Sequence, residues 1–430
     1  MKILIIGNGG REHALLHKLH DDAPAGEFFI TRGNGGTAAL AQAVRLDASD
    51  GINLATWAEQ NDIALAVCGP EGPLADGIAE HFARRRVPFF GPTQGAANIE
   101  ASKSYAKKLM RDAGVPTAAF GSFADAEAAE AFIREHDTPL VVKASGLAGG
   151  KGAVICDTVE EALDAARAML TGSAFGFAGS VIVVEEFLRG EELSVFALTD
   201  GTDALLLLPA QDHKRIGEGD SGPNTGGMGA YSPVSIAGAS LLERIRTDII
   251  LPTLAALAAD GNPFRGLLYA GVMLTSDGPQ VIEFNARFGD PETQAILPLL
   301  ESSLLDPMLA IARGESIRGI QLRWRNAAAL TTVLAAAGYP GTYPRGEAIT
   351  IPQAVSDAHD VIVYHAGTAL RAGGLVTAGG RVLAVTAVAP DMRTAAKRSR
   401  WAAAAIEFPG RYYRTDIGWR ELARRVAAAT

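Results

Sequence analysis

The first hundred residues alternate short apolar runs with alanine-rich, amphipathic stretches. The apolar runs lie at 2–6, 63–68 and 87–90, and each is followed directly by a glycine-containing turn. Between them, the stretches at 51–60 and 74–86 have the composition of helices. Strands that end in turns and alternate with helices are typical of βαβ units, so this pattern predicts a parallel sheet over roughly residues 1–100.

The pattern changes twice along the rest of the chain. A helix is expected at 102–116, where glycine and proline close it, and strands follow at 139–143 and 181–188. Residues 193–300 then alternate short strands with polar, glycine-rich loops. From about residue 327, short strands with turns between them predict a separate, mostly antiparallel domain that ends in helices.

Composition narrows the class of protein and its partners. A chain of 430 residues exceeds a single core, so two to four domains are expected. The formal charge of -9 disfavours a nucleic-acid partner, although local basic pockets could still bind small anions. No run of about 18 apolar residues occurs, so we expect a cytoplasmic protein without a membrane partner. Cys68 and Cys156, the only cysteines, lie in or beside apolar runs and are expected to be buried free thiols.

The first glycine motif, Gly7-x-Gly9, follows a strand and opens a helix. Amides at a helix N-terminus bind phosphate, which is the function we favour for this turn. A dinucleotide-binding fingerprint would need a small residue at position 12, and Glu12 stands there. A nicotinamide-dependent dehydrogenase is therefore disfavoured, and a tight turn without a ligand stays an alternative.

A second glycine-rich loop spans 143–152, KASGLAGGKG. Its amides could wrap around phosphate oxygens, with Lys143 and Lys151 at its ends. It is not a Walker A loop, because Gly152 stands where that motif requires Ser or Thr. The alternative is a solvated flexible loop without a ligand.

Acidic residues follow the strand at 181–184. Glu185 and Glu186 come at its end, next to Phe187 and Leu188. Paired acids are often only a solvated rim, but here an apolar patch beside carboxylates is a plausible slot for adenine and ribose.

The segment 280–294, QVIEFNARFGDPETQ, is the most informative in the chain. Glu283 and Asn285 alternate with apolar residues on a strand, so both should point to one face. Hard oxygen ligands at this spacing suit Mg²⁺ held together with nucleotide phosphates, and Arg287 could clamp a carboxylate or an acyl-phosphate. The alternative is a surface strand whose Glu and Arg form a structural ion pair.

Two further segments carry candidate chemistry. Lys214 and Arg215 are cations beside Asp212 and His213, and the glycine-rich stretch 222–233 could bring backbone close to an anion. A lone histidine is more often structural than catalytic, so His213 is assigned no role.

Taken together, seven segments in register resemble glycinamide ribonucleotide synthetase, the phosphoribosylamine–glycine ligase family of the ATP-grasp superfamily. They are GNGGREH (7–13), GPEGPL (69–74), KASGLAGGKG (143–152), EEFLRGEELS (185–194), QDHKR (211–215), GPNTGGMGAYSP (222–233) and EFNARFGDPETQ (283–294).

The resemblance implies an α/β multidomain fold with a parallel N-terminal domain, ATP-grasp central and lid domains, and a mostly antiparallel α+β C-terminal domain. The implied boundaries are 1–100 for the N-terminal domain, 101–122 with 193–325 for the central domain, 123–192 for the lid, and 326–430 for the C-terminal domain. A monomer or weak homodimer is expected.

The resemblance also implies roles for individual residues. ATP would contact Lys103, Lys143, Ser145, Gly146, Lys151, Gly152, Glu185, Glu186, Phe187, Leu188, Glu192 and Lys214. Glycine and phosphoribosylamine would contact Gly9, Gly10, Glu71, Asp212, Arg287, Asp290, Pro291 and Glu292. Mg²⁺ or Mn²⁺ would be held by Glu283 and Asn285, while Arg287, Asp212 and Lys214 would act in the chemical step.

The implied reaction joins glycine to 5-phosphoribosylamine through a glycyl-phosphate, in de novo purine biosynthesis, and releases ADP and phosphate. One feature departs from many ATP-grasp enzymes, because the strand at 269–274 (YAGVML) has no carboxylate to serve as a second metal ligand. A carboxylase or formate-using transformylase of the same superfamily is the near alternative. A non-catalytic ATP-binding regulator would be expected to lack Lys143, Glu283 or Asn285, and all three are present.

Overall fold

The N-terminal part of the chain forms a parallel sheet. In the computed structural model, which describes residues 1–172 and 174–427, this sheet has the strand order β3-β2-β1-β4-β5. Its strands are β1 (Lys2–Ile6), β2 (Glu27–Thr31), β3 (Gln42–Val44), β4 (Leu65–Cys68) and β5 (Phe89–Phe90), and all neighbours run parallel. The intervening helices are α1 (Gly10–Asp22), η1 (Thr37–Ala39), α2 (Gly51–Gln60), α3 (Glu71–Ala75) and α4 (Ile78–Arg84). The predicted βαβ pattern is therefore confirmed.

Two helices lead from this sheet into a central antiparallel sheet with the order β11-β10-β16-β17. The helices are α5 (Gln94–Ala101) and α6 (Lys103–Asp112), and the Ser102 side chain caps α6 by accepting a hydrogen bond from the Tyr105 amide. The strands are β10 (Glu191–Thr199), β11 (Ala204–Leu206), β16 (Gly266–Thr275) and β17 (Gly278–Asn285). Further helices here are α9 (Ala239–Ile245), η4 (Arg246–Ile250), α10 (Leu251–Ala259), α11 (Glu292–Ile296), η5 (Leu297–Leu299) and α12 (Leu305–Arg313).

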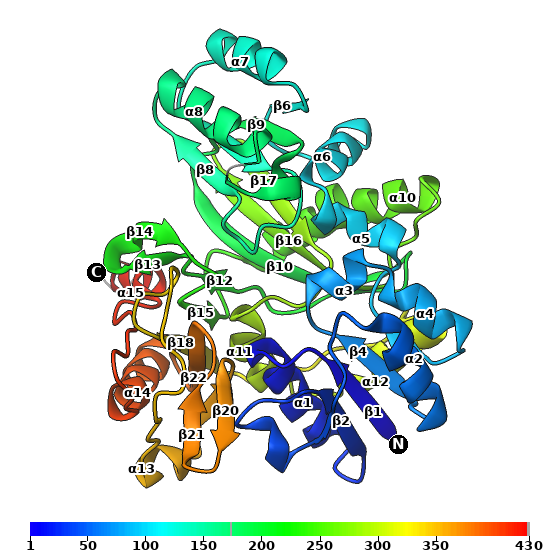
Figure 1. Ribbon diagram of the computed structural model, residues 1–430, viewed down its shortest axis with the longest axis vertical. Helices are drawn as coiled ribbons and strands as arrows, with labels where there is room; N and C mark the ends of the chain where they lie inside the picture. The colour runs from blue at the N-terminus through cyan, green and yellow to red at the C-terminus, as the bar shows by residue number, and fades with distance from the viewer. Residues whose placement is uncertain (173, 428–430) are drawn as a thin grey trace.

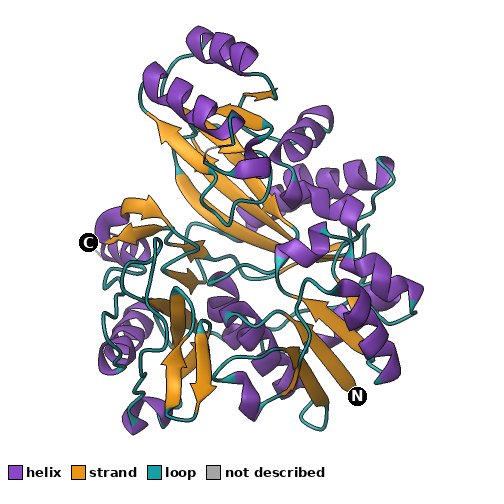
Figure 2. Cartoon of the chain, viewed as in Figure 1, coloured by secondary structure: helices purple, strands orange, loops and turns teal. Residues whose placement is uncertain are grey.

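A smaller antiparallel sheet, the lid sheet, lies next to the central sheet (Figure 1) and has the order β6-β9-β7-β8. Its strands are β6 (Phe120–Phe123), β7 (Leu140–Ala144), β8 (Ala153–Cys156) and β9 (Ile182–Glu186). Its helices are α7 (Ala126–Glu135), α8 (Val159–Leu170) and η2 (Gly176–Gly179). Figure 2 shows the two long helices on the outer side of this sheet, away from the central strands, so its inner face is turned toward the central sheet.

The last quarter of the chain contributes three of the five strands of an antiparallel sheet with the order β12-β15-β18-β22-β19. Its strands are β12 (Gln211–Asp212), β15 (Gly229–Ser232), β18 (Ala328–Ala335), β19 (Val361–His365) and β22 (Arg381–Ala389). The hairpins β13 (Arg215–Gly217) with η3 (Glu218–Asp220) and β14 (Ser221–Asn224), and β20 (Thr368–Arg371) with β21 (Gly374–Thr377), flank it. Its helices are α13 (Gln353–Ser356), α14 (Met392–Ala405) and α15 (Trp419–Ala427).

The sheet of the last quarter confirms the expected α+β character but also includes β12 and β15, which come from within 193–325. The QDHKR segment and the glycine-rich stretch after it therefore lie where the central and C-terminal parts meet. The four domain boundaries stay predictions.

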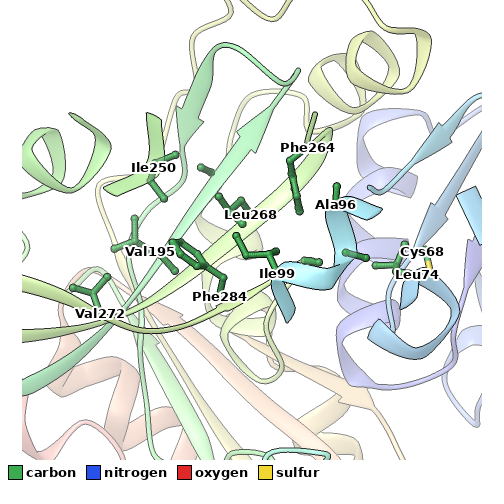
Figure 3. Close-up of a cluster of buried hydrophobic side chains, with 14 of the residues drawn as sticks. Cys68, Leu74, Ala96, Ile99, Val195, Ile250, Phe264, Leu268, Val272 and Phe284 are labelled. Atoms are coloured by element: carbon green, nitrogen blue, oxygen red, sulfur yellow. The ribbon is translucent and has the colours of Figure 1, made fainter. Parts of the chain in front are cut away.

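One apolar core joins the N-terminal and central parts. Figure 3 shows Ile99 of α5 beside Phe284, Leu268 and Val195 of the central sheet, with the core continuing toward Cys68. This continuity fixes helix α5 and the carboxyl end of β4 against the central sheet. Cys68 and Cys156 are buried and free, as predicted. Among the described helices, none is long and apolar enough to cross a membrane.

Candidate active site

A cavity of about 390 Å³ lies between the lid sheet, the central sheet and helices α5 and α6. Charged and polar side chains from every part of the fold line it: Arg11, Glu71, Glu100, Lys103, Lys107, Lys143, Glu185, Glu186, Glu192, Asp212, Lys214, Thr225, Tyr269, Glu283, Asn285, Arg287, Asp290, Glu292 and Arg381. The backbone of 147–150 and Gly152 contributes to the same wall.

The glycine-rich lid loop and the Glu-x-Asn strand meet in this cavity. Lys143, at the end of β7, donates from Nζ to the backbone oxygen of Ile282 on β17, at 3.2 Å. This contact places the phosphate-loop candidate directly against the metal-site candidate, as the sequence predicts for two segments that act on one ligand.

Two lysines share one carboxylate oxygen in the lid wall. Glu185 Oε2 lies 2.9 Å from Lys143 Nζ and 3.0 Å from Lys107 Nζ, and Lys107 also donates to Thr117 Oγ1 at 2.7 Å. Burial lowers the pKa of Lys107 to about 8, although Glu185 opposes the shift. Glu185 Oε1 is buried, has no partner among the described residues, and lines the cavity wall. This oxygen, Oε1, is therefore free to accept a hydrogen bond from a ligand.

An apolar slot adjoins this carboxylate. Val141 and Ile155 pair in register on β7 and β8, and both line the cavity together with Phe187 and Leu188. An apolar wall beside a free carboxylate oxygen can hold a flat aromatic base that carries an amino group.

Glu283 and Asn285 face the cavity from β17, as their alternation predicts. Burial would raise the pKa of Glu283, but the positive charges of Lys214, Lys103 and Lys143 outweigh it and lower that pKa. On the neighbouring strand β16, the residue paired with Glu283 is Gly271, so β16 adds no carboxylate at this position. Glu283 is thus an ionised carboxylate held among positive charges.

Two carboxylates hold Arg287, which follows the end of the same strand. Its Nε lies 3.1 Å from Glu71 Oε2 and its Nη2 lies 2.7 Å from Glu100 Oε1, while Glu100 Oε2 accepts a 2.7 Å hydrogen bond from the Ala286 amide. Burial raises the pKa of Glu100, and the pKa of Glu71 falls to about 2 because Arg287 and Arg11 outweigh its burial. The guanidinium is therefore held in one position by contacts with both carboxylates.

Asp212 and Lys214 project into the cavity from β12 and the residues after it. Burial raises the pKa of Asp212 to about 7, with Lys214 opposing the rise and Glu292 adding to it. Lys214 pairs with Glu192. His213, between them, lies outside the cavity lining and accepts a hydrogen bond from the Gly418 amide at Nε2, at 3.2 Å.

The N-terminal turn has a different organisation from a dinucleotide site. Glu12 Oε2 accepts a 2.6 Å hydrogen bond from the Gly9 amide, and Glu12 Oε1 accepts one of 2.7 Å from Arg11 Nε. A Cβ on Gly69 would come within 1.9 Å of Glu12 Oε1, so the Glu12 side chain packs against the backbone of Gly69, directly after β4. Glu12 thus stands where the dinucleotide fingerprint requires a small residue for close packing of helix and strand, which agrees with the case against a dehydrogenase.

Most predicted site residues line the cavity, and six do not: Gly9, Gly10, Ser145, Gly146, Lys151 and Pro291. Ser145 accepts a hydrogen bond at Oγ from the Ser104 amide, and Lys151 Nζ donates to the Pro340 oxygen at 2.9 Å. Their roles in binding stay predictions.

Five of the charged and tyrosine residues in the lining had no predicted role: Arg11, Glu100, Lys107, Tyr269 and Arg381. Arg11 belonged to a recognised motif, whereas the others lie in helices or at strand positions whose spacing carries no local signal.

A nucleotide-sized cavity between a lid sheet and a central sheet, with lysines on one wall and a Glu-x-Asn pair on the other, defines an ATP-grasp ligase. Enzymes of this class use ATP and a divalent metal ion.

Comparison with known proteins narrows the class to one family. Residues 1–100, 101–293 and 329–420 match the N domain, the ATP-grasp (A) domain and the C domain of phosphoribosylglycinamide synthetase. The chain belongs to this family.

The relatives extend over the full chain. Phosphoribosylamine–glycine ligase of Brucella melitensis is 45% identical over 427 residues, which cover 99% of this chain and 100% of that protein. The enzyme of the same name from Nostoc sp. is 47% identical over 425 residues, covering 98% and 99%.

Solved structures agree. Phosphoribosylamine–glycine ligase of Thermotoga maritima has a TM-score of 0.84 at 32% identity and covers 97% of this chain and 100% of that chain. A biotin carboxylase from Campylobacter jejuni has a TM-score of 0.73 at 16% identity, covering 96% and 92%, and supports the fold alone.

Proposed function

We propose that this enzyme joins glycine to 5-phosphoribosylamine, with ATP as the energy source, and forms glycinamide ribonucleotide through a glycyl-phosphate. The observation that carries the proposal is the meeting of the Lys143 loop with the Glu283–Asn285 strand in one cavity that Asp212 and Arg287 also line. The relatives that match over their full length, both phosphoribosylamine–glycine ligases, support the same reaction.

ATP would lie between the lid and the central sheet. Its adenine would enter the slot beside Glu185 and Leu188, and its ribose would reach Glu192. Lys103, Lys143 and Lys214 would neutralise the phosphates, because all three surround Glu283 closely enough to lower its pKa.

The metal-binding residues fit Mg²⁺ or Mn²⁺. No group of three or more His, Cys, Asp or Glu side chains within the described residues forms a closed metal cage. One carboxylate and one amide oxygen suit a hard cation that completes its shell with water and nucleotide phosphates. Bound there, the metal would neutralise charge on the transferring phosphoryl group.

Glycine would bind with its carboxylate at Arg287 and its ammonium group at Asp212. Its carboxylate is a poor electrophile until the γ-phosphoryl group of ATP is transferred to it. The amine of phosphoribosylamine then attacks the carbonyl carbon, the C–O bond to phosphate breaks, and a proton leaves the nitrogen. The side chains named here act by charge neutralisation and positioning rather than by covalent chemistry.

The experiment is an ADP-release assay with ATP, Mg²⁺, glycine and freshly generated phosphoribosylamine, in which each component is omitted in turn. ADP release that requires both glycine and the amine, with glycinamide ribonucleotide as product, would support the proposal. Release that requires bicarbonate or formate and ignores glycine would overturn it.

A further inference from the structure

Asp290 lines the cavity, and only one of its two carboxylate oxygens has a hydrogen-bond or ion-pair partner among the described residues. Its Oδ1 accepts a 2.8 Å hydrogen bond from Gln294 Nε2 and lies 3.3 Å from Arg381 Nη1. Its Oδ2 has no partner among the described residues, and a Cβ placed on Gly9 would lie 3.8 Å from it. The carboxylate is therefore held at one oxygen and open at the other, and the open oxygen lies toward Gly9 of the first glycine turn.

The two residues that hold Oδ1 come from different parts of the fold. Gln294 lies on α11 and is 1% exposed, and the neighbouring carboxylate requires its amide nitrogen, rather than its oxygen, to face Asp290. Arg381 is the first residue of β22 in the C-terminal sheet. The carboxylate is thus positioned jointly by a buried amide and by a cation from a separate sheet.

Arg381 also fixes the backbone around Asp290. Its Nη1 donates to the backbone oxygens of Asp290 at 2.8 Å and of Gly226. A Cβ on Gly226 would lie 3.1 Å from the guanidinium carbon, so the absence of a side chain there allows the arginine to approach. The Tyr339 hydroxyl accepts a 3.0 Å hydrogen bond from the Gly226 amide and holds the same turn.

A carboxylate oxygen without a partner selects for a ligand that carries hydrogen-bond donors. ATP and the carboxylate of glycine offer mainly acceptors to this part of the wall, whereas an amino sugar carries hydroxyl and amine protons. Under the proposed function, the matching substrate is 5-phosphoribosylamine.

We propose that Arg381 and Gln294 are positioning residues for the amino-sugar substrate, which they serve by orienting Asp290 so that Oδ2 accepts a hydrogen bond from it. Neither residue touches the substrate through this contact. The inference rests on the proposed function and adds a contribution of the C-terminal sheet to substrate recognition.

The test measures steady-state kinetics of Arg381→Met, Arg381→Lys and Gln294→Met, with each of the three substrates varied in turn. Loss of a hydrogen bond to a charged group should raise the KM for phosphoribosylamine roughly 10- to 100-fold in Arg381→Met, because Asp290 is no longer held. The KM values for ATP and glycine should change by less than about threefold, because neither ligand uses Oδ2. Arg381→Lys should recover part of the loss by keeping a cation beside Oδ1.

Arg398→Met is the matched control, because Arg398 forms an ion pair with Asp360 in the same part of the chain and is not in the cavity lining. Its three KM values should equal those of the wild type. Gln294→Met should shift the amine KM in the same direction as Arg381→Met, and it tests the idea separately if Arg381→Met fails to fold.

Equal KM increases for all three substrates, or a fall in kcat alone, would overturn the inference and leave the proposed function standing. If the wild-type protein releases no ADP with glycine and the amine, the proposed function is overturned. The role of Asp290 in binding the amine then falls as well.

Discussion

Replacement of Glu283 by glutamine removes one full negative charge from the cavity without changing the size of the side chain. The surrounding lysines Lys214, Lys103 and Lys143 lower the pKa of Glu283, so the carboxylate is ionised throughout the neutral range. Glutamine keeps one oxygen as a ligand but cannot neutralise a divalent cation.

The expected loss follows from this charge. Removal of one preorganised stabilising group lowers kcat by about 10²–10³, which corresponds to about 3–4 kcal/mol in the activation free energy. The Mg²⁺ concentration that gives half-maximal rate should rise as well. The assay is ADP release at saturating ATP, glycine and amine, with Mg²⁺ varied.

Thermal unfolding gives a second readout of the same variant. A carboxylate whose pKa is lower in the folded state than in the unfolded state stabilises the protein at pH values above its pKa in the unfolded state. This stabilisation is lost as the pH falls through the pKa that the group has in the folded state. Glu283→Gln should therefore unfold at a lower temperature than the wild type at pH 7, and the difference should shrink as the solution is made acidic. Asp277→Asn, in the exposed turn before β17, is the charge-matched control.

Unchanged kcat and unchanged Mg²⁺ dependence in Glu283→Gln would refute the metal assignment.

Three further outcomes are expected. Lys151→Ala should raise the KM for ATP, because the loop loses its cation, and an unchanged KM in ATP titrations would contradict phosphate closure by that residue. The kcat/KM for glycine should rise with pH through about 7 as Asp212 ionises. Glu292→Gln should move the midpoint of this rise to lower pH, because it removes a negative charge near Asp212. A pH profile identical to that of the wild type would contradict the electrostatic interaction between Glu292 and Asp212. Lys107→Met should lower the free energy of unfolding by about 1–3 kcal/mol, because Glu185 loses one buried partner, and urea titration measures it.

The common orientation of Glu283 and Asn285 could be predicted from the sequence because strand geometry is local. Glu283 and Asn285 lie two residues apart among apolar neighbours, and this spacing alone places both on one face of β17. Burial of Cys68 and Cys156 followed from their apolar surroundings in the same way.

Other site residues could not be predicted because their positions depend on how distant segments pair. Arg381 begins a strand that is otherwise ordinary in composition, and only the pairing of β22 with β18 brings it to the cavity. Lys107 reads as a solvated helix residue in KSYAKKLM, yet it is 2% exposed because β9 places Glu185 against it. The joining of β12 and β15 to the C-terminal sheet was missed for a related reason, since strands of two and four residues carry almost no periodic signal.

The lid sheet packs around an apolar interior of its own. Its buried residues, among them Ile133, Leu140 and Met169, form a cluster that includes no side chain from the central or C-terminal sheets. Contacts such as those of Lys143 with Ile282 and of Lys151 with Pro340 cross to the neighbouring parts, and they are polar. A hinge rotation of the lid sheet would therefore exchange these hydrogen bonds for hydrogen bonds with water and would leave the apolar cluster packed.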